Sequence, residues 1–125
     1  MVEQSSAGTA HHAPFGITET WIDGIAVVSV LDPVDMLSAP QLSEAICAVL
    51  ATAPSGLIVD LTEVDFLASV GMSVLVEAQN WASAISAQFG VVADGAATAR
   101  PMKLLGLDAV LALYPTLDAA LRDFH

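Results

Sequence analysis

The sequence predicts an α/β domain in which helices pack alongside a mixed, mostly parallel central sheet. Three short apolar runs are typical of strands buried on both faces: Ile25–Leu31, Leu57–Leu61 and Phe89–Ala93. Stretches with helical periodicity separate these runs. Strands that alternate with helices of this length form right-handed crossovers, which make neighbouring strands parallel. The expected order of elements is ββαβαβαβα.

A hairpin is expected to open the domain. Residues Ile17–Asp23 alternate between the two faces of a strand, and Asp23-Gly24 then separates them from the next apolar run. This dipeptide between two strands is typical of a tight hairpin, so the first strand is antiparallel to the second. Residues 1–13 are predicted to be a disordered tail, and residues 14–125 to form the domain.

The first helix is predicted over Ala39–Ala53, with Ser38 as N-cap. A short helix capped by Thr98 and running through Leu105, a brief strand near Leu111–Tyr114 and a last helix over Thr116–Phe124, capped by Thr116, complete the domain. The apolar stripe of the first helix is predicted to be Leu42, Ile46, Val49, Leu50 and Ala53.

The second helix is predicted from Ser69 to about Gln88. Met72 and Val76 are expected on its outer face, where they are either scattered surface residues or part of a contact patch near Met36-Leu37. The core stripe of this helix is predicted to be Val70, Val74, Ala78, Trp81 and Ile85.

The charge balance restricts the classes of partner. Three basic residues against fourteen acidic ones give a net charge of −11. So few cations cannot drive binding to nucleic acid or to anionic membranes. A protein partner with a basic face fits this charge, and so does plain solubility. No apolar run is long enough to span a bilayer, and the first residues lack the features of a secretory signal, so a cytoplasmic location is expected.

Signatures of catalysis are missing from the sequence. Outside the predicted tail the only histidine is His125, and Cys47 is the only cysteine. There is no nucleophile elbow, no phosphate-binding glycine loop with lysine and no His-Glu-x-x-His motif. We therefore expect a protein that is not an enzyme and that has no cofactor and no metal site. Isolated glycines such as Gly90 are interpreted as punctuation between elements.

The junction Ala68-Ser69-Val70-Gly71 has two interpretations. Ser69 is either a simple N-cap or the acceptor of a phosphoryl group, which the positive end of a helix stabilises. Asp60 and Asp65 lie close in sequence. Because they would crowd the added charge, phosphorylation is expected to break a protein contact rather than to order a loop.

Several segments together carry a family resemblance. They are Leu57–Leu61, Val64–Leu67, Ser69–Gly71, Phe89–Ala93 and Leu104–Asp108. On these residues the chain resembles STAS domains from about Ile17 to Phe124. It is most similar to stand-alone bacterial anti-sigma factor antagonists, in particular those of the mycobacterial sigma-F type.

The resemblance implies a mechanism of partner switching. Such an antagonist binds an anti-sigma factor, which is often also a serine kinase of the GHKL type, and thereby releases a sigma factor for transcription. Phosphorylation of the antagonist dissolves the complex. The resemblance makes Ser69 the phosphoacceptor. The implied partner-binding residues are Asp35, Met36, Ala68, Ser69, Val70, Gly71, Met72 and Val76.

Two positions depart from the family pattern. Ala68 stands where the family has an aspartate, and Val70 stands where it has a second hydroxyl residue. Control by the supply of partner alone is therefore an alternative to phosphorylation. Two other functions stay open: a module that senses a nucleotide or a lipid, and a scaffold subunit of a stress-signalling assembly. The sequence does not determine the oligomeric state.

Overall fold

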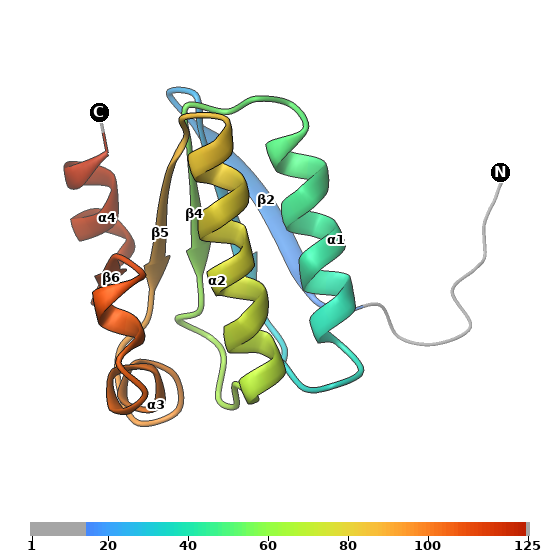
Figure 1. The fold of residues 1–125 in the computed structure, drawn as a ribbon, viewed down its shortest axis with the longest axis vertical. Helices are drawn as coiled ribbons and strands as arrows, with labels where there is room; N and C mark the ends of the chain where they lie inside the picture. The colour runs from blue at the N-terminus through green and yellow to red at the C-terminus, as the bar shows by residue number, and fades with distance from the viewer. Residues whose placement is uncertain (1–14, 125) are drawn as a thin grey trace, which may run out of the picture.

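A five-stranded sheet forms the centre of the computed structural model, which describes residues 15–124 (Figure 1). The strands follow one another across the sheet in chain order. The first pair is antiparallel and all other pairs are parallel, so the sheet is mixed as predicted. The strands are β2 (Ile17–Ile22), β3 (Ile25–Val30), β4 (Gly56–Asp60), β5 (Gln88–Val92) and β6 (Leu113–Tyr114).

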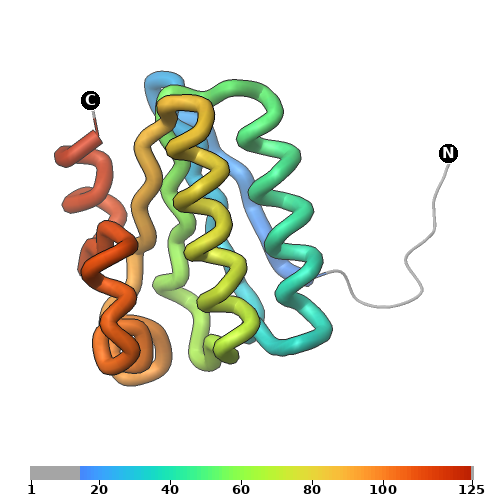
Figure 2. The backbone as a smooth tube through the Cα atoms, viewed as in Figure 1, coloured from blue at the N-terminus to red at the C-terminus, as the bar shows by residue number. Residues whose placement is uncertain are grey.

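The helices lie on both faces of this sheet. Two long helices lie side by side over one face, and the last helix packs against the other (Figures 1 and 2). Each crossover from β3 to β5 moves one strand in the same direction, so right-handed connections place both long helices on the same face. The helices are α1 (Ala39–Leu50), α2 (Ser69–Ala84), α3 (Ala99–Leu104) and α4 (Leu117–Asp123), with a 3₁₀ turn η1 (Leu107–Ala109).

The core is divided into two layers by the sheet. Alternate residues of each strand point to opposite faces, so Val28 and Val59 belong to the layer under α1 and α2. Val27 and Ile58 belong to the layer under α4. All four side chains are at most 2% exposed. The prediction that these strands are buried on both faces is confirmed.

Gly90 makes room for α4, which corrects its interpretation as punctuation. A Cβ atom at Gly90 would lie 2.8 Å from Cε2 of Tyr114 and 3.1 Å from Cζ of Phe124. The two rings pack edge to face with their centroids 6.3 Å apart. Gly56 on the neighbouring strand is similarly close to Phe124. A strip of sheet without side chains thus receives the aromatic end of the chain.

The two long helices were predicted to extend too far at their C-terminal ends. Helix α1 ends at Leu50, and Ala53 is exposed with a φ of 56°, so it does not belong to the apolar stripe. Helix α2 ends at Ala84, because Ser86 has a φ of 59° and Gln88 already belongs to β5. Pattern alone does not locate the point where a helix turns back toward the sheet.

The turn and cap predictions had mixed outcomes. Asp23 and Gly24 both have positive φ, as a tight hairpin requires. Thr116 caps α4 as predicted, accepting a hydrogen bond from Ala119 N at 3.1 Å. Ser38 and Thr98 stand at N-cap positions but make no side-chain cap, and both have backbone angles outside the extended region that a cap adopts.

Two further findings concern only residues 15–124. No helix in this range has the length and apolar character to cross a membrane, and no cluster of three metal-ligating side chains was found there. The predicted tail and His125 lie outside the described residues.

Candidate functional site

Three loops meet at the end of the sheet where the parallel strands finish. They connect β3 to α1, β4 to α2 and β5 to α3, and all three lie at the lower end of the molecule in Figure 2. In open α/β sheets this carboxyl edge is the usual place for a functional site, because its loops vary without disturbing the core. Most of the residues predicted for partner binding lie here.

The first two loops are joined by backbone hydrogen bonds. Val34 and Leu67 form an isolated parallel bridge. Val34 N donates to Phe66 O at 2.9 Å, and Ala68 N donates to Val34 O at 2.8 Å. The segment before α1 is thereby held against the segment that leads into α2.

Gly71 lets α2 approach this bridge. A Cβ atom at Gly71 would lie 2.6 Å from Cγ1 of Val34 and 2.8 Å from Cδ1 of Leu67. Both distances are shorter than real Cβ atoms tolerate, so a larger residue would force the helix or the loop to move. Gly71 therefore allows the first turn of α2 to pack closely against the bridge, and Gly71 itself is buried.

Asp35 organises the β3–α1 loop. Its Oδ1 accepts hydrogen bonds from the backbone N–H groups of Leu37 and Ser38, each at 2.9 Å. Ser38 Oγ lies 3.0 Å from Pro33 O and accepts a hydrogen bond from Asp35 N. The hydrogen bonds from Ser38 hold the pKa of the Asp35 carboxyl below its usual value, because they favour the charged form. Asp35 thus holds Met36 and Leu37 in place.

Ser69 is the first residue of α2 and not its cap. Ala68 occupies the N-cap position with extended backbone angles. Ser69 is exposed, and its carbonyl oxygen accepts a hydrogen bond from Ser73 Oγ at 3.2 Å. The interpretation of Ser69 as an N-cap is therefore wrong. The hydroxyl lies on the surface in the first turn of a 16-residue helix.

The predicted faces of α2 were right at Val74 and Ala78, which are buried, and wrong at three other positions. Met72 is only 7% exposed, whereas Val70 is 37% exposed and Ile85 is 45% exposed. Two small residues of the buried stripe, Gly71 and Ala82, were not predicted, because a scan for large apolar side chains overlooks them. Trp81 and Val76 are half-buried. The residues buried on α2 are Gly71, Met72, Val74, Leu75, Ala78 and Ala82.

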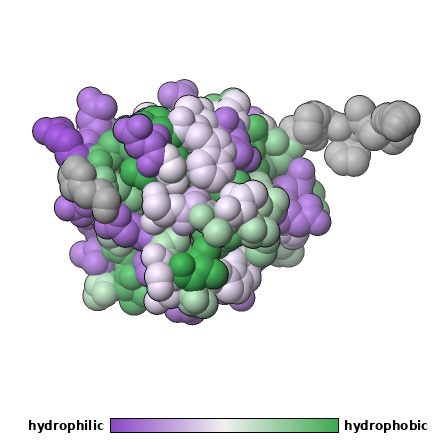
Figure 3. Space-filling view, turned by 90° about the horizontal axis from the view of Figure 1, so that it is seen from above, coloured by the Kyte–Doolittle hydropathy of each residue, from purple (hydrophilic) through white to green (hydrophobic). Residues whose placement is uncertain are grey.

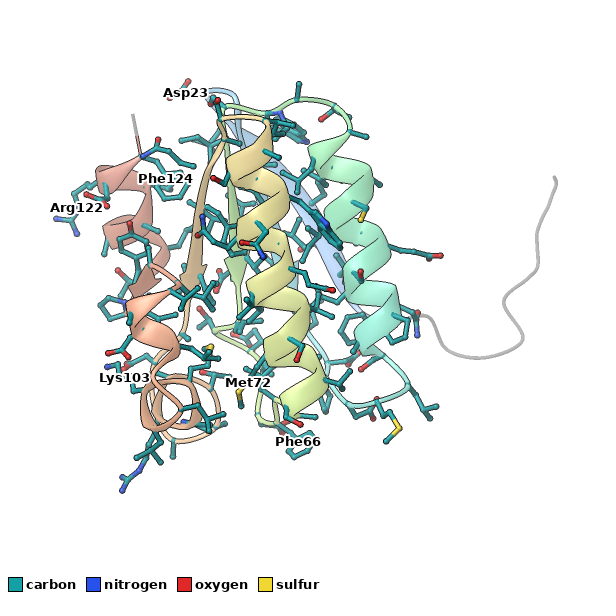
Figure 4. All side chains as sticks on the ribbon, in the orientation of Figure 1. Asp23, Phe66, Met72, Lys103, Arg122 and Phe124 are labelled. Atoms are coloured by element: carbon teal, nitrogen blue, oxygen red, sulfur yellow. The ribbon has the colours of Figure 1, made fainter. Side chains whose placement is uncertain are left out.

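A groove of about 380 Å³ separates α2 from the chain between α3 and η1. Met72 lies on the side of α2 that faces α3, as Figure 4 shows. Sequence reasoning missed the opposite wall, and the only available signal was the apolar run that follows Lys103. The groove is lined by Ser69, Met72, Ser73, Val76 and Glu77 on one side and by Leu105 and Leu107 on the other.

Large apolar side chains are exposed around these loops. Phe66, which the sequence reasoning did not select, is 52% exposed at the lower end of α2 (Figure 4). The opposite end of the molecule, seen in Figure 3, mixes hydrophilic and hydrophobic residues. We define the carboxyl-end surface as the exposed side chains Met36, Leu37, Phe66, Val70, Leu104 and Leu105.

Charge is unevenly distributed over the three loops. Among the described residues, the β3–α1 and β4–α2 loops contain acidic but no basic residues. Arg100 and Lys103 lie on α3 and, with Asp94, line a shallow pocket of about 460 Å³. Most of this end of the molecule is therefore acidic around an apolar centre, with a small basic spot on one side.

The chain belongs to the STAS domain family, whose model matches residues 18–120. It is 44% identical over 111 residues to the anti-sigma-F factor antagonist RsfB of Mycobacterium tuberculosis. That alignment covers 87% of this chain and 90% of RsfB.

Solved structures agree with this assignment. An anti-sigma factor antagonist from Mycobacterium paratuberculosis superposes with a TM-score of 0.83 at 44% identity, covering 89% of this chain and 94% of that one. A STAS domain protein from Planctomyces limnophilus has a TM-score of 0.78 at 19% identity, with coverage of 90% and 100%, and supports the fold alone. The resemblance inferred from the sequence is confirmed.

Proposed function

We propose that this protein is a non-catalytic, cytoplasmic anti-sigma factor antagonist. The similarity to RsfB over most of both chains carries this proposal. By binding an anti-sigma factor, the protein frees the sigma factor that the anti-sigma factor holds, and so regulates transcription by partner switching.

The carboxyl-end surface is the proposed docking site. Leu37 is 84% exposed and Phe66 is 52% exposed. A partner that removes such apolar side chains from water stabilises the complex. The bridge between Val34 and Leu67 and the hydrogen bonds of Asp35 fix the loops that present them. A preorganised surface loses little conformational entropy on binding.

Binding and competition measurements test this function. The purified chain is titrated with the anti-sigma-F factor of Mycobacterium tuberculosis, alone and in complex with its sigma factor. We expect a stable complex and release of the sigma factor. Phe66→Asp should weaken binding about tenfold or more, because it places a charge at the centre of an apolar interface. Ile85→Asp, at the other end of α2, is the matched control. Absence of any complex with the wild-type chain contradicts the proposal.

Phosphorylation of Ser69 is proposed as a separate control of this contact. The Ser69 side chain is exposed and lies beside the acidic loops. A phosphate there would place up to two negative charges within an apolar interface and next to acidic loops, so the cost of desolvation and the like-charge repulsion should weaken binding. Ser69→Glu should reduce the affinity, while Ser69→Ala should keep it.

Intact-mass spectrometry tests the phosphorylation itself. The chain is incubated with ATP and the anti-sigma factor, and the gain of one phosphoryl group is measured. A gain that Ser69→Ala abolishes supports the proposal. No gain, or a gain that survives Ser69→Ala, rejects Ser69 as the acceptor and leaves control to the supply of partner.

A further inference from the structure

The geometry points to the groove between α2 and η1 as an anchor pocket for an apolar side chain that the partner carries next to a basic residue. This inference rests on the proposed function and names a second, distinct part of the docking site. The groove shares Leu105 with the carboxyl-end surface, and its lining includes Ser69, next to Val70 of that surface, so one partner can cover the surface and reach into the groove.

The lining of the groove is apolar at its base. Met72 is 7% exposed, and Val76 and Leu107 are half-buried, so a side chain inserted here exchanges water for apolar contacts. Leu105, on the opposite wall, is 64% exposed. The volume of about 380 Å³ is near the lower limit of small-molecule pockets, and it fits one or two protein side chains.

The only charged residue in the lining is Glu77, and this selects the class of occupant. The lining of the groove contains no basic residue that could bind the phosphates of a nucleotide or the carboxylate of a fatty acid. Glu77 would repel both, whereas it attracts an arginine or lysine. Arg100 and Lys103 line a different pocket, on α3. An amphipathic helix with a leucine or methionine anchor flanked by a basic residue therefore fits best.

Matched pairs of variants test the anchor pocket. Leu105→Asp charges one wall of the groove, and Val110→Asp is its control. Val110 lies in the same segment between α3 and β6, is 51% exposed, and does not line the groove. Glu77→Lys reverses the charge in the groove, and Glu44→Lys makes the same change at an exposed position on α1. None of these four side chains is buried, so the variants should fold.

The dissociation constants are measured for the full chain with the Mycobacterium tuberculosis anti-sigma-F factor as probe. We expect Leu105→Asp to weaken binding about tenfold or more and Glu77→Lys by about threefold or more, with each control within about twofold of the wild type. In parallel, the NMR signal of the Met72 methyl group should shift in a saturable manner with the probe but not with decanoate or ATP.

The outcomes separate the two proposals. If the wild type binds but Leu105→Asp and Glu77→Lys bind like their controls, the anchor pocket is rejected and the proposed function stands. If the wild type does not bind, both are rejected. A saturable shift of Met72 with decanoate or ATP would replace the protein side chain by a small ligand as the occupant.

Discussion

At the scale of single residues, Gly71 determines how closely α2 approaches the β3–α1 loop. Gly71→Val places methyl groups where even a Cβ atom would lie 2.6 Å from Val34. We expect a loss of about 1–3 kcal/mol in the free energy of unfolding, because overpacking strains the contact. Urea denaturation measures it. Asn80→Val introduces the same residue at an exposed position of α2 and should change stability by less than about 0.5 kcal/mol. Equal stability of the two variants would contradict this role of Gly71.

Tyr114 gives the domain a dependence on alkaline pH. Its hydroxyl donates a hydrogen bond to Asp123, and burial together with the nearby carboxylate raises its pKa from 10.0 to about 12. The folded state holds the phenolic proton more tightly than the unfolded state. This contribution to stability is therefore complete below about pH 10 and is lost as the pH rises toward about 12.

Urea denaturation at about pH 9 and about pH 11 measures this effect. The wild type should lose stability between the two values, and Tyr114→Phe should lose less because it has no phenol to ionise. The same loss in both proteins would show that Tyr114 is not the responsible group.

At the scale of elements, the strands could be predicted far better than the helix faces. Continuous apolar runs such as Leu57–Leu61 have one structural solution in this context, a strand buried on both sides. The buried stripe of α2 also contains Gly71 and Ala82, which the apolar pattern did not select, because close packing of the helix favours small side chains. Hydropathy favoured Val70 and Ile85, which are exposed.

The candidate site could be predicted only in part, because tertiary contacts decide which side chains are exposed and which segments meet. Asp35, Met36 and Ser69 were selected from the loop positions and the family pattern, and the structure places them at one end of the sheet. Phe66 sits between an aspartate and a buried leucine, so nothing local marks it as exposed. Leu105 meets α2 only through the tertiary fold, which the sequence pattern does not contain.

Helix α4 docks on the sheet through the gap at Gly90. Gly90→Val should displace the rings of Tyr114 and Phe124 and cost about 1–3 kcal/mol, measured by urea denaturation. Phe124→Leu, which shortens the obstructed side chain, should recover part of this loss in the double variant. Because α4 lies on the face opposite α1 and α2, binding to the anti-sigma factor should be unchanged. Purely additive losses would mean that Gly90 does not serve to accommodate the ring.

At the scale of the whole molecule, the net charge of −11 makes association with a basic partner depend on salt. The association rate should fall about tenfold between low and high ionic strength, because screening shortens the range of attraction, whereas the dissociation rate changes less. Stopped-flow mixing with the anti-sigma factor measures both rates.

The distribution of this charge, and not only its sum, should govern the encounter. Asp65 lies in the β4–α2 loop next to Phe66, and Asp118 lies on α4 on the other side of the sheet; both are exposed. Asp65→Lys and Asp118→Lys change the net charge equally. Attraction near the docking site decays over a screening length of about 10 Å at 0.1 M salt, so Asp65→Lys should slow association several-fold more than Asp118→Lys. Equal slowing would mean that the partner responds to total charge and that the acidic loops do not orient it.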